Sequence, residues 1–240
     1  MTTSVPAKRV WCSRRHAILW SLSTAAALLF GGVLTFATVD EMERLARVIP
    51  PTPPEVTRDL IVRNASDQLG RRASFRILLF TDEFRWRLSS SDTLENGSKG
   101  PVFTPAMITV LNDAEEVICV GASSEEIPAG VPFESGRAIE ERRAARRAEQ
   151  IAVWVRSAMS KPIPIRKLNA GYHRPTAGSP RDTSDQRRVV IILVLDHDEG
   201  TNIDEALRDT MASESVRAPI FDALLTKYSL SSRSQFSWAP

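Results

Sequence analysis

The chain has 240 residues, of which 42% are hydrophobic and 25% are charged, an ordinary composition for a globular protein that excludes a fully disordered one. Its two cysteines are too few for a disulfide-built scaffold or a four-thiolate zinc site. The net charge is +2, but residues 1–39 carry four basic side chains and no acidic one. The rest of the chain is therefore close to neutral, which gives no reason to expect nucleic-acid binding.

Residues 17–39 form an uncharged, largely apolar stretch. A helix of this length rises about 35 Å, enough to cross a hydrocarbon core of about 30 Å. Basic residues precede the stretch and acidic residues follow it, an asymmetry that keeps the N-terminus in the cytoplasm. The sequence therefore predicts one transmembrane helix, with residues 1–16 as a cytoplasmic tail and the rest of the chain across the membrane. The alternative is a cleaved signal peptide, although such peptides usually have an apolar core of only ~7–15 residues.

Residues 40–72 are expected to link the membrane segment to a globular part. Prolines at positions 50, 51, 53 and 54 predict an extended, semi-rigid spacer. A short amphipathic helix is predicted over 55–69, because apolar residues recur there at near-helical spacing.

A mixed domain is predicted over residues 73–230, followed by a polar tail over 231–240. The stretch 187–195 contains seven consecutive apolar residues, which suits a central strand buried on both faces. Other buried strands are predicted at 74–80, 116–121 and 163–171. A more exposed strand is expected at 84–88, and turn residues predict a polar loop at 89–101.

Three helical segments are expected between and after these strands. The first begins near Thr104 and Pro105, since threonine is a good N-cap and proline suits the first helical position. A long helix over 136–159 has small and aliphatic residues on one face and charges on the other. Helical structure over 202–229 closes the domain. The fold class is therefore predicted to be α/β, in the form of an α+β sandwich.

The order of these elements, together with three short motifs, resembles the OmpA-like domain. Gly121–Ser124 stands where that family has Gly-His-Thr-Asp, at the end of a strand. Arg147–Ala148 reproduces an Arg-Ala pair on the long helix, and residues 186–191 stand at the family's Asn-Arg-Arg-Val-Glu-Ile. The family comprises the peptidoglycan-binding modules of outer-membrane porins, Pal lipoproteins and flagellar motor B subunits. The match covers residues 74–195.

The resemblance implies a β-α-β-α-β-β core packed on helices, located in the periplasm and held at the bacterial inner membrane by the single span. It further implies contact with peptidoglycan, by which the protein tethers or organises an envelope complex. The implied ligand-binding residues are Arg147, Ser124, Gly121 and Glu125. In the family, a loop aspartate and the helix arginine hold the diaminopimelate residue of the stem peptide, because its free end carries an ammonium and a carboxylate.

The family's aspartate is replaced here by Ser124, which cannot supply a negative charge. The loss of a charge-assisted hydrogen bond costs about 1.5–3 kcal/mol, unless Glu125 or Glu126 reaches the same place. The alternative is therefore a degenerate OmpA-like interaction subunit that docks other inner-membrane or envelope proteins without binding diaminopimelate. Stator subunits and the B subunit of the Zorya anti-phage system share this layout. Their proton path uses an aspartate inside the span, and residues 17–39 contain none.

No pattern in the sequence indicates an enzyme, a cofactor or a metal site. There is no nucleophile elbow, P-loop or dinucleotide fingerprint. The run Asp-His-Asp-Glu at 196–199 is interpreted as a polar loop after a strand, and Cys119 as a small buried residue. His173 carries no signal. Arginines and glutamates interleave over 134–149, which is typical of a solvated, ion-paired helix face.

Overall fold

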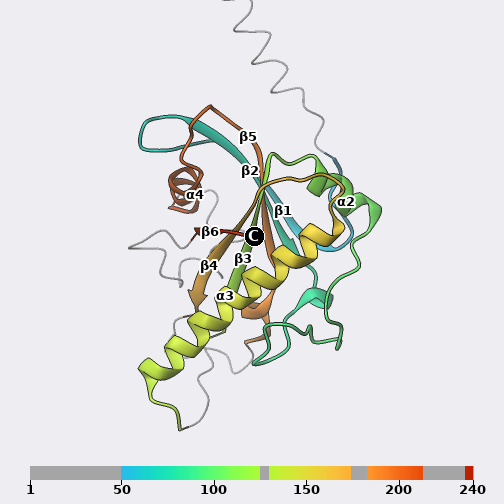
Figure 1. The fold of residues 1–240 in the computed structure, drawn as a ribbon, viewed down its shortest axis with the longest axis vertical. Coiled ribbons are helices and arrows are strands. Elements are labelled where there is room, and N and C mark those ends of the chain that lie inside the picture. The colour runs from blue at the N-terminus through green and yellow to red at the C-terminus, as the bar shows by residue number, and fades with distance from the viewer. Residues whose placement is uncertain (1–49, 125–129, 174–182, 213–235, 240) are drawn as a thin grey trace, which may run out of the picture. The chain divides into compact units, whose positions relative to one another are not determined.

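Six strands form one mixed sheet in the order β1-β2-β5-β3-β4-β6 (Figure 1). The computed structural model describes residues 50–124, 130–173, 183–212 and 236–239. The strands are β1 (Val56–Ser66), β2 (Arg72–Phe80), β3 (Glu116–Ser123), β4 (Ile165–Tyr172), β5 (Val190–His197) and β6 (Phe236–Trp238). β3 and β4 are parallel, whereas the other neighbouring pairs are antiparallel. The fold is therefore α+β with a mixed sheet.

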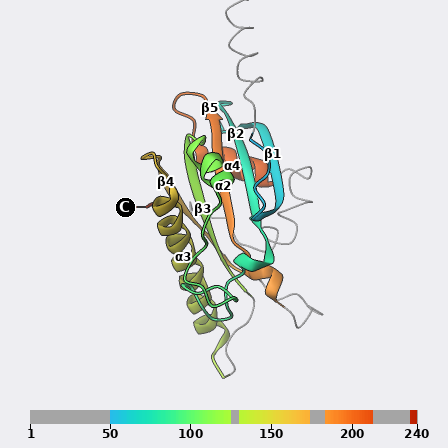
Figure 2. The ribbon, with the colours of Figure 1, turned by 90° about the vertical axis from the view of Figure 1, so that its right-hand side faces the viewer.

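Apolar layers lie on both faces of this sheet. α2 (Pro105–Asn112) and α3 (Phe133–Ala158) contribute to one buried cluster, and α4 (Ile203–Ala212) to the other. α3 runs along β3 and β4, whereas α4 packs on β1 and β2 (Figures 1 and 2). Successive residues of β2, Ile77 and Leu78, enter opposite clusters, as the alternation of side chains along a strand requires. Burial on both faces explains the unbroken apolar runs of the central strands.

Most of the predicted core elements are confirmed, with small shifts at their ends. β2, β3, β4 and β5 fall on the predicted buried strands, and α3 on the predicted long helix. α2 begins at Pro105, and the Thr104 hydroxyl accepts a hydrogen bond from the backbone N–H of Met107 (3.3 Å). The cap and the proline therefore act at this helix start as the sequence indicates.

The prediction of a helix over 55–69 is wrong, because this segment is mostly β1. β1 pairs with β2 along most of its length. Leu60 and Val62, two residues apart, pack against one core cluster of the sheet, whereas the preceding residue, Asp59, pairs with Arg76. The apolar residues thus alternate along a strand, and pairing with a distant segment outweighs their near-helical spacing.

The predicted exposed strand at 84–88 is also wrong. A short 3₁₀ helix, η1 (Asp82–Phe84), is followed by a loop in which Trp86 and Leu94 form an isolated bridge. Trp86 is almost fully buried and stacks on Trp154 of α3, with ring centroids 4.9 Å apart. The loop is therefore held against α3 by its aromatic residue, which the alternation of apolar and basic residues does not reveal.

The proline-rich segment is docked on the domain from Pro50 onward. The Pro50 carbonyl accepts a hydrogen bond from Arg76 (2.9 Å), whose guanidinium also binds Asp59 (2.6 Å). Glu55 accepts a hydrogen bond from the backbone N–H of Thr104 at the start of α2 (2.6 Å). The described part of the predicted spacer is therefore fixed to the sheet rather than extended away from it.

Several predictions fall wholly or partly outside the described residues. The span at 17–39 and the linker up to position 49 lie outside them, as does the part of the predicted terminal helix beyond 212. In the part of the chain that the structure describes, no helix is both long and apolar enough to cross a membrane. Part of the predicted polar tail forms β6, which pairs with β4.

Candidate functional site

The residues that the sequence singles out come together where β3 and β4 end. These strands are parallel, so their carboxyl ends lie at the same edge of the sheet. Gly121–Ser124 closes β3, and α3 lies beside it. Gly121 and Ser124 at the end of β3 and Arg147 on α3 therefore lie in the same part of the fold. Glu125 lies outside the described residues.

Gly121 is a point of close approach between β3 and the backbone of α3. A Cβ atom at this position would overlap the carbonyl oxygen of Ala144 and lie 2.5 Å from the backbone nitrogen of Ala148. Because both obstacles are backbone atoms, no side-chain rotation could relieve the clash. The glycine therefore has a packing role that accounts for its presence without a ligand.

Arg147 is buried, with 1% of its surface exposed. Its Nη1 donates a hydrogen bond to the carbonyl of Ala122 (2.8 Å), and its Nε to the carbonyl of Ser90 (2.9 Å). The guanidinium also lies over the ring of Trp86, 5.5 Å from the centroid. Arg147 thus joins the end of β3 to the loop after η1, and its charge is satisfied within the protein.

Ser124 is likewise buried, with 2% of its surface exposed. In this arrangement neither Ser124 nor Arg147 presents a polar group to solvent. The expectation that these two residues hold a stem peptide stays a prediction, and it requires the loop around Ser90 to move.

Glu140 belongs to the same site, where its carboxylate is buried. The interleaved charges of the sequence instead predict a solvated helix face for this residue. Glu140 accepts a hydrogen bond from the Ser123 hydroxyl and forms an ion pair with Arg143. Arg137 and Glu141, four residues apart on the same helix, form the more exposed ion pair that the interleaved charges predict. The helix therefore has both a solvated face and a buried polar one. The available signal was that Glu140 and Arg147 are seven residues apart, hence on one helix face.

His173 is the second residue of this site that the sequence did not indicate. It follows β4, is buried, and its backbone N–H donates to the carbonyl of Ser123 (2.8 Å). The strand-end cluster thus comprises Ser123, Glu140, Arg143, Arg147 and His173. Its hydrogen bonds connect β3, β4, α3 and the Ser90 loop, so the arrangement is that of a buried polar network.

The motif at 186–191 supplies two arginines that hold η1 and the loop after it. The Arg187 guanidinium pairs with Glu95 (3.0 Å) and donates to the carbonyl of Trp86 (3.2 Å). Arg188 pairs with Asp82 (2.8 Å). Arg147 and Arg187 therefore both hold the loop after η1, and Arg188 holds η1 itself.

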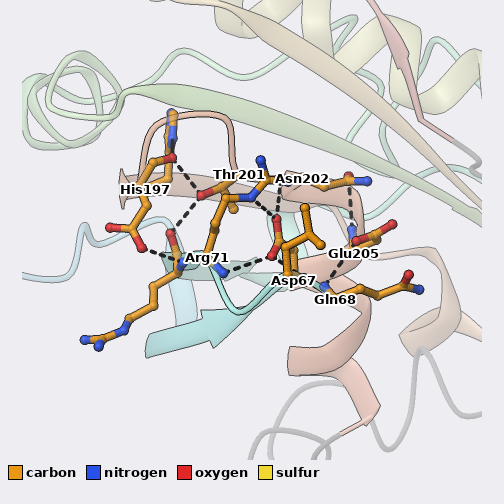
Figure 3. Close-up of polar contacts among 10 residues, drawn as sticks. Asp67, Gln68, Arg71, His197, Thr201, Asn202 and Glu205 are labelled. Carbon is orange, nitrogen blue, oxygen red and sulfur yellow. Dashed lines mark hydrogen bonds and ion pairs between the residues drawn. The ribbon is translucent and has the colours of Figure 1, made fainter.

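A second polar cluster, drawn in Figure 3, joins the β1–β2 turn to the start of α4. Asp67 accepts hydrogen bonds from the backbone N–H groups of Leu69 (2.9 Å), Arg71 (2.9 Å) and Asn202 (3.0 Å), and from the Arg71 side chain (2.8 Å). Burial raises the pKa of Asp67, but the hydrogen bonds from Asn202 and Arg71 outweigh it and lower the pKa to about 2. This carboxylate is a structural clamp.

The acidic run at 196–199 belongs to the same clamp. Asp198 accepts a hydrogen bond from the backbone N–H of Arg72 (2.8 Å), and its carbonyl accepts one from the Thr201 hydroxyl (2.7 Å). Among the described residues, no three His, Cys, Asp or Glu side chains are grouped to hold a metal ion. Cys119 is buried in β3, and this burial raises the pKa of its thiol, which disfavours the reactive thiolate.

Comparisons with protein-family models, with curated proteins and with solved structures find no match to this chain.

Proposed function

We propose that this chain is a single-pass inner-membrane protein whose periplasmic OmpA-like domain docks another envelope protein. The element order supports the family assignment, since β2, α2, β3, α3, β4 and β5 follow one another as β-α-β-α-β-β. Further support comes from Gly121 against α3 and from Arg147 on that helix beside the end of β3.

The observation that carries the docking role is the internal use of Arg147. Its guanidinium is buried and bonded to two carbonyl oxygens. Each hydrogen bond to a charged group contributes about 1.5–3 kcal/mol. A stem-peptide carboxylate that replaced both would start with an affinity loss of about 10²–10⁴-fold. With serine at position 124 in addition, the charge pair that reads diaminopimelate is not available.

The short connection to the proposed anchor favours a partner at the membrane. The predicted span ends at residue 39, and the chain is already bound to Arg76 at Pro50. The intervening residues can extend over at most about 40 Å. A domain on so short a connection suits contact with the extramembrane part of a neighbouring membrane protein.

Peptidoglycan binding is the second candidate. The observation in its favour is that Arg147 donates to the carbonyl of Ala122, two residues before Ser124, so two positions of the family's site are adjacent. In this case the Ser90 loop would open when the stem peptide binds.

Co-sedimentation separates the two candidates. The full chain, extracted from membranes, is mixed with diaminopimelate-type peptidoglycan and centrifuged, with native electrophoresis of the same extract in parallel. Docking predicts that the chain stays in the supernatant and migrates in a complex larger than itself. Sedimentation that free diaminopimelate abolishes would support the second candidate and contradict the first. Migration as a single chain would also contradict docking.

A further inference from the structure

β6 covers only part of the outer edge of β4. It pairs antiparallel with Arg166, Lys167 and Leu168, and the following residue, Ala239, donates its backbone N–H to the carbonyl of Ile165 (2.9 Å). Beyond Leu168, β4 continues to Tyr172, and within the described ranges no strand pairs with that part of this edge. The edge is therefore longer than the strand that occupies it.

The side chains of the tail contact the edge in a specific way. The indole of Trp238 lies over the guanidinium of Arg166, 4.4 Å from ring centroid to Cζ, and Glu116 holds that guanidinium in place (3.0 Å). Phe236 packs on the cluster beneath α4, and Ala239 on the cluster beneath α3. Even so, Trp238 keeps 59% of its surface exposed. The contact therefore uses Phe236, which packs on the core, and Trp238, which stacks on Arg166. The two residues are two positions apart and lie on the same face of the strand.

We propose that the outer edge of β4 is an acceptor site for an extended polypeptide strand, and that residues 236–239 occupy it as a displaceable strap. The partner that this edge fits is an extended protein segment with an apolar and an aromatic residue two positions apart, the aromatic ring stacking on Arg166. In such strand addition the backbone hydrogen bonds give affinity, and the alternate side chains give specificity. The inference does not depend on the docking or peptidoglycan proposals.

Release of the strap leaves the rest of the sheet in place. β4 is held on its inner edge by seven residue pairs with β3. β6 is only three residues long and is separated from the end of α4 by residues 213–235. The edge exposed by its release would present unpaired N–H and C=O groups, the usual template for a further strand.

The test uses a fluorescent peptide of residues 234–240 and the purified full chain with and without residues 236–240. We expect the peptide to bind the shortened chain, detected by fluorescence anisotropy, and to bind the intact chain far more weakly. Replacement of the peptide's tryptophan by alanine (Trp238→Ala) should weaken binding about 2–30-fold, because the cation–π contact is lost. A shortened chain that melts like the intact one but does not bind the peptide would overturn the proposal.

A reversible lock gives the matched control. Lys167 and Ser237 are directly opposite, and the Cα atoms of such pairs are close enough for a disulfide. In a Lys167→Cys/Ser237→Cys chain, oxidation should abolish peptide binding and reduction should restore the intact chain's weak binding. If the shortened chain fails to fold, the full chain with Trp238→Ala replaces it, and it should bind the unmodified peptide more tightly than the intact chain does. Equal binding by the two chains would refute the strap.

Discussion

The guanidinium of Arg147 lies over the indole ring of Trp86, 5.5 Å from its centroid, while Trp86 itself stacks on Trp154 of the same helix. The arginine that the family motif assigns to ligand binding thus helps α3 to hold the indole of Trp86, which lies between Arg147 and Trp154. Because Arg147 has several partners within the protein, we expect its substitution to lower the stability of the folded domain.

Arg147→Ala should lower the free energy of unfolding by about 2–4 kcal/mol, because two carbonyl oxygens lose their donor and a buried side chain is deleted. The midpoint of thermal unfolding should fall by about 5–10 °C. Arg146→Ala is the matched control, since Arg146 is exposed on the same helix and its loss should change stability by less than about 0.5 kcal/mol. Equal midpoints for the two variants would show that Arg147 is not a structural residue.

Gly121→Ala should destabilise the domain by at least about 1–3 kcal/mol, because the added methyl group meets the backbone of α3. Gly97→Ala serves as the comparison. Gly97 has a positive φ of 82° but open space around it, so alanine there suffers backbone strain alone. Urea unfolding should give a lower midpoint for Gly121→Ala than for Gly97→Ala. The reverse order would mean that α3 does not lie on Gly121.

Asp67→Asn should lower the melting temperature at neutral pH, since an amide cannot replace a carboxylate that accepts four hydrogen bonds. The folded-state pKa of Asp67, about 2, is below its ordinary value of 3.8. Its stabilisation is therefore fully present above pH 3.8 and is lost as the pH falls through about 2. The difference between wild type and variant should shrink over this range. A difference that is constant from pH 6 to about 2 would contradict the clamp.

Burial raises the pKa of Glu116, with Arg166 opposing the shift, so this carboxyl has the opposite effect on stability. Its contribution favours folding at low pH and weakens as the pH rises through its raised pKa. The Asp67 clamp is for this reason measured as a difference between two chains at each pH, in which the effect of Glu116 cancels.

The membrane topology is tested by a reporter that is active only in the periplasm, fused after Pro240. We expect the fusion to be active and the membrane-extracted protein to keep its N-terminus, because a 23-residue uncharged stretch suits an uncleaved anchor. An inactive reporter would mean that the C-terminal end of the chain lies in the cytoplasm, opposite to the proposed orientation. A mature N-terminus near Thr38 would mean that the stretch is a cleaved signal peptide.

The sequence predicts correctly those parts of the fold that are determined by residues close together along the chain. The apolar run ending at Leu195 suits a strand that is buried on both faces. Thr104 and Pro105 define a helix start through the Thr104 hydrogen bond and the φ angle of the proline. The sequence did not predict β1, because this segment is a strand only through its pairing with β2. It did not predict β6, because three residues are too few to show a periodic pattern. These are non-local pairings.

The candidate site shows the same division. The proximity of Gly121 and Arg147 follows from the order of elements, which the sequence predicts. Their burial does not, because it depends on a loop carbonyl at Ser90 and on the ring of Trp86, both distant along the chain. Glu140 was placed on a solvated face for the same reason, since its partner Ser123 belongs to another element.

The most direct test of the docking proposal is the thermal unfolding of the full chain with and without a soluble diaminopimelate-containing stem peptide. A ligand that binds the folded state raises the melting temperature in proportion to the logarithm of its concentration above Kd. Docking without peptidoglycan recognition predicts an unchanged melting temperature at every peptide concentration, for the wild type and for Arg147→Lys alike. A melting temperature that rises with the peptide in the wild type, and no longer rises in Arg147→Lys, would contradict it.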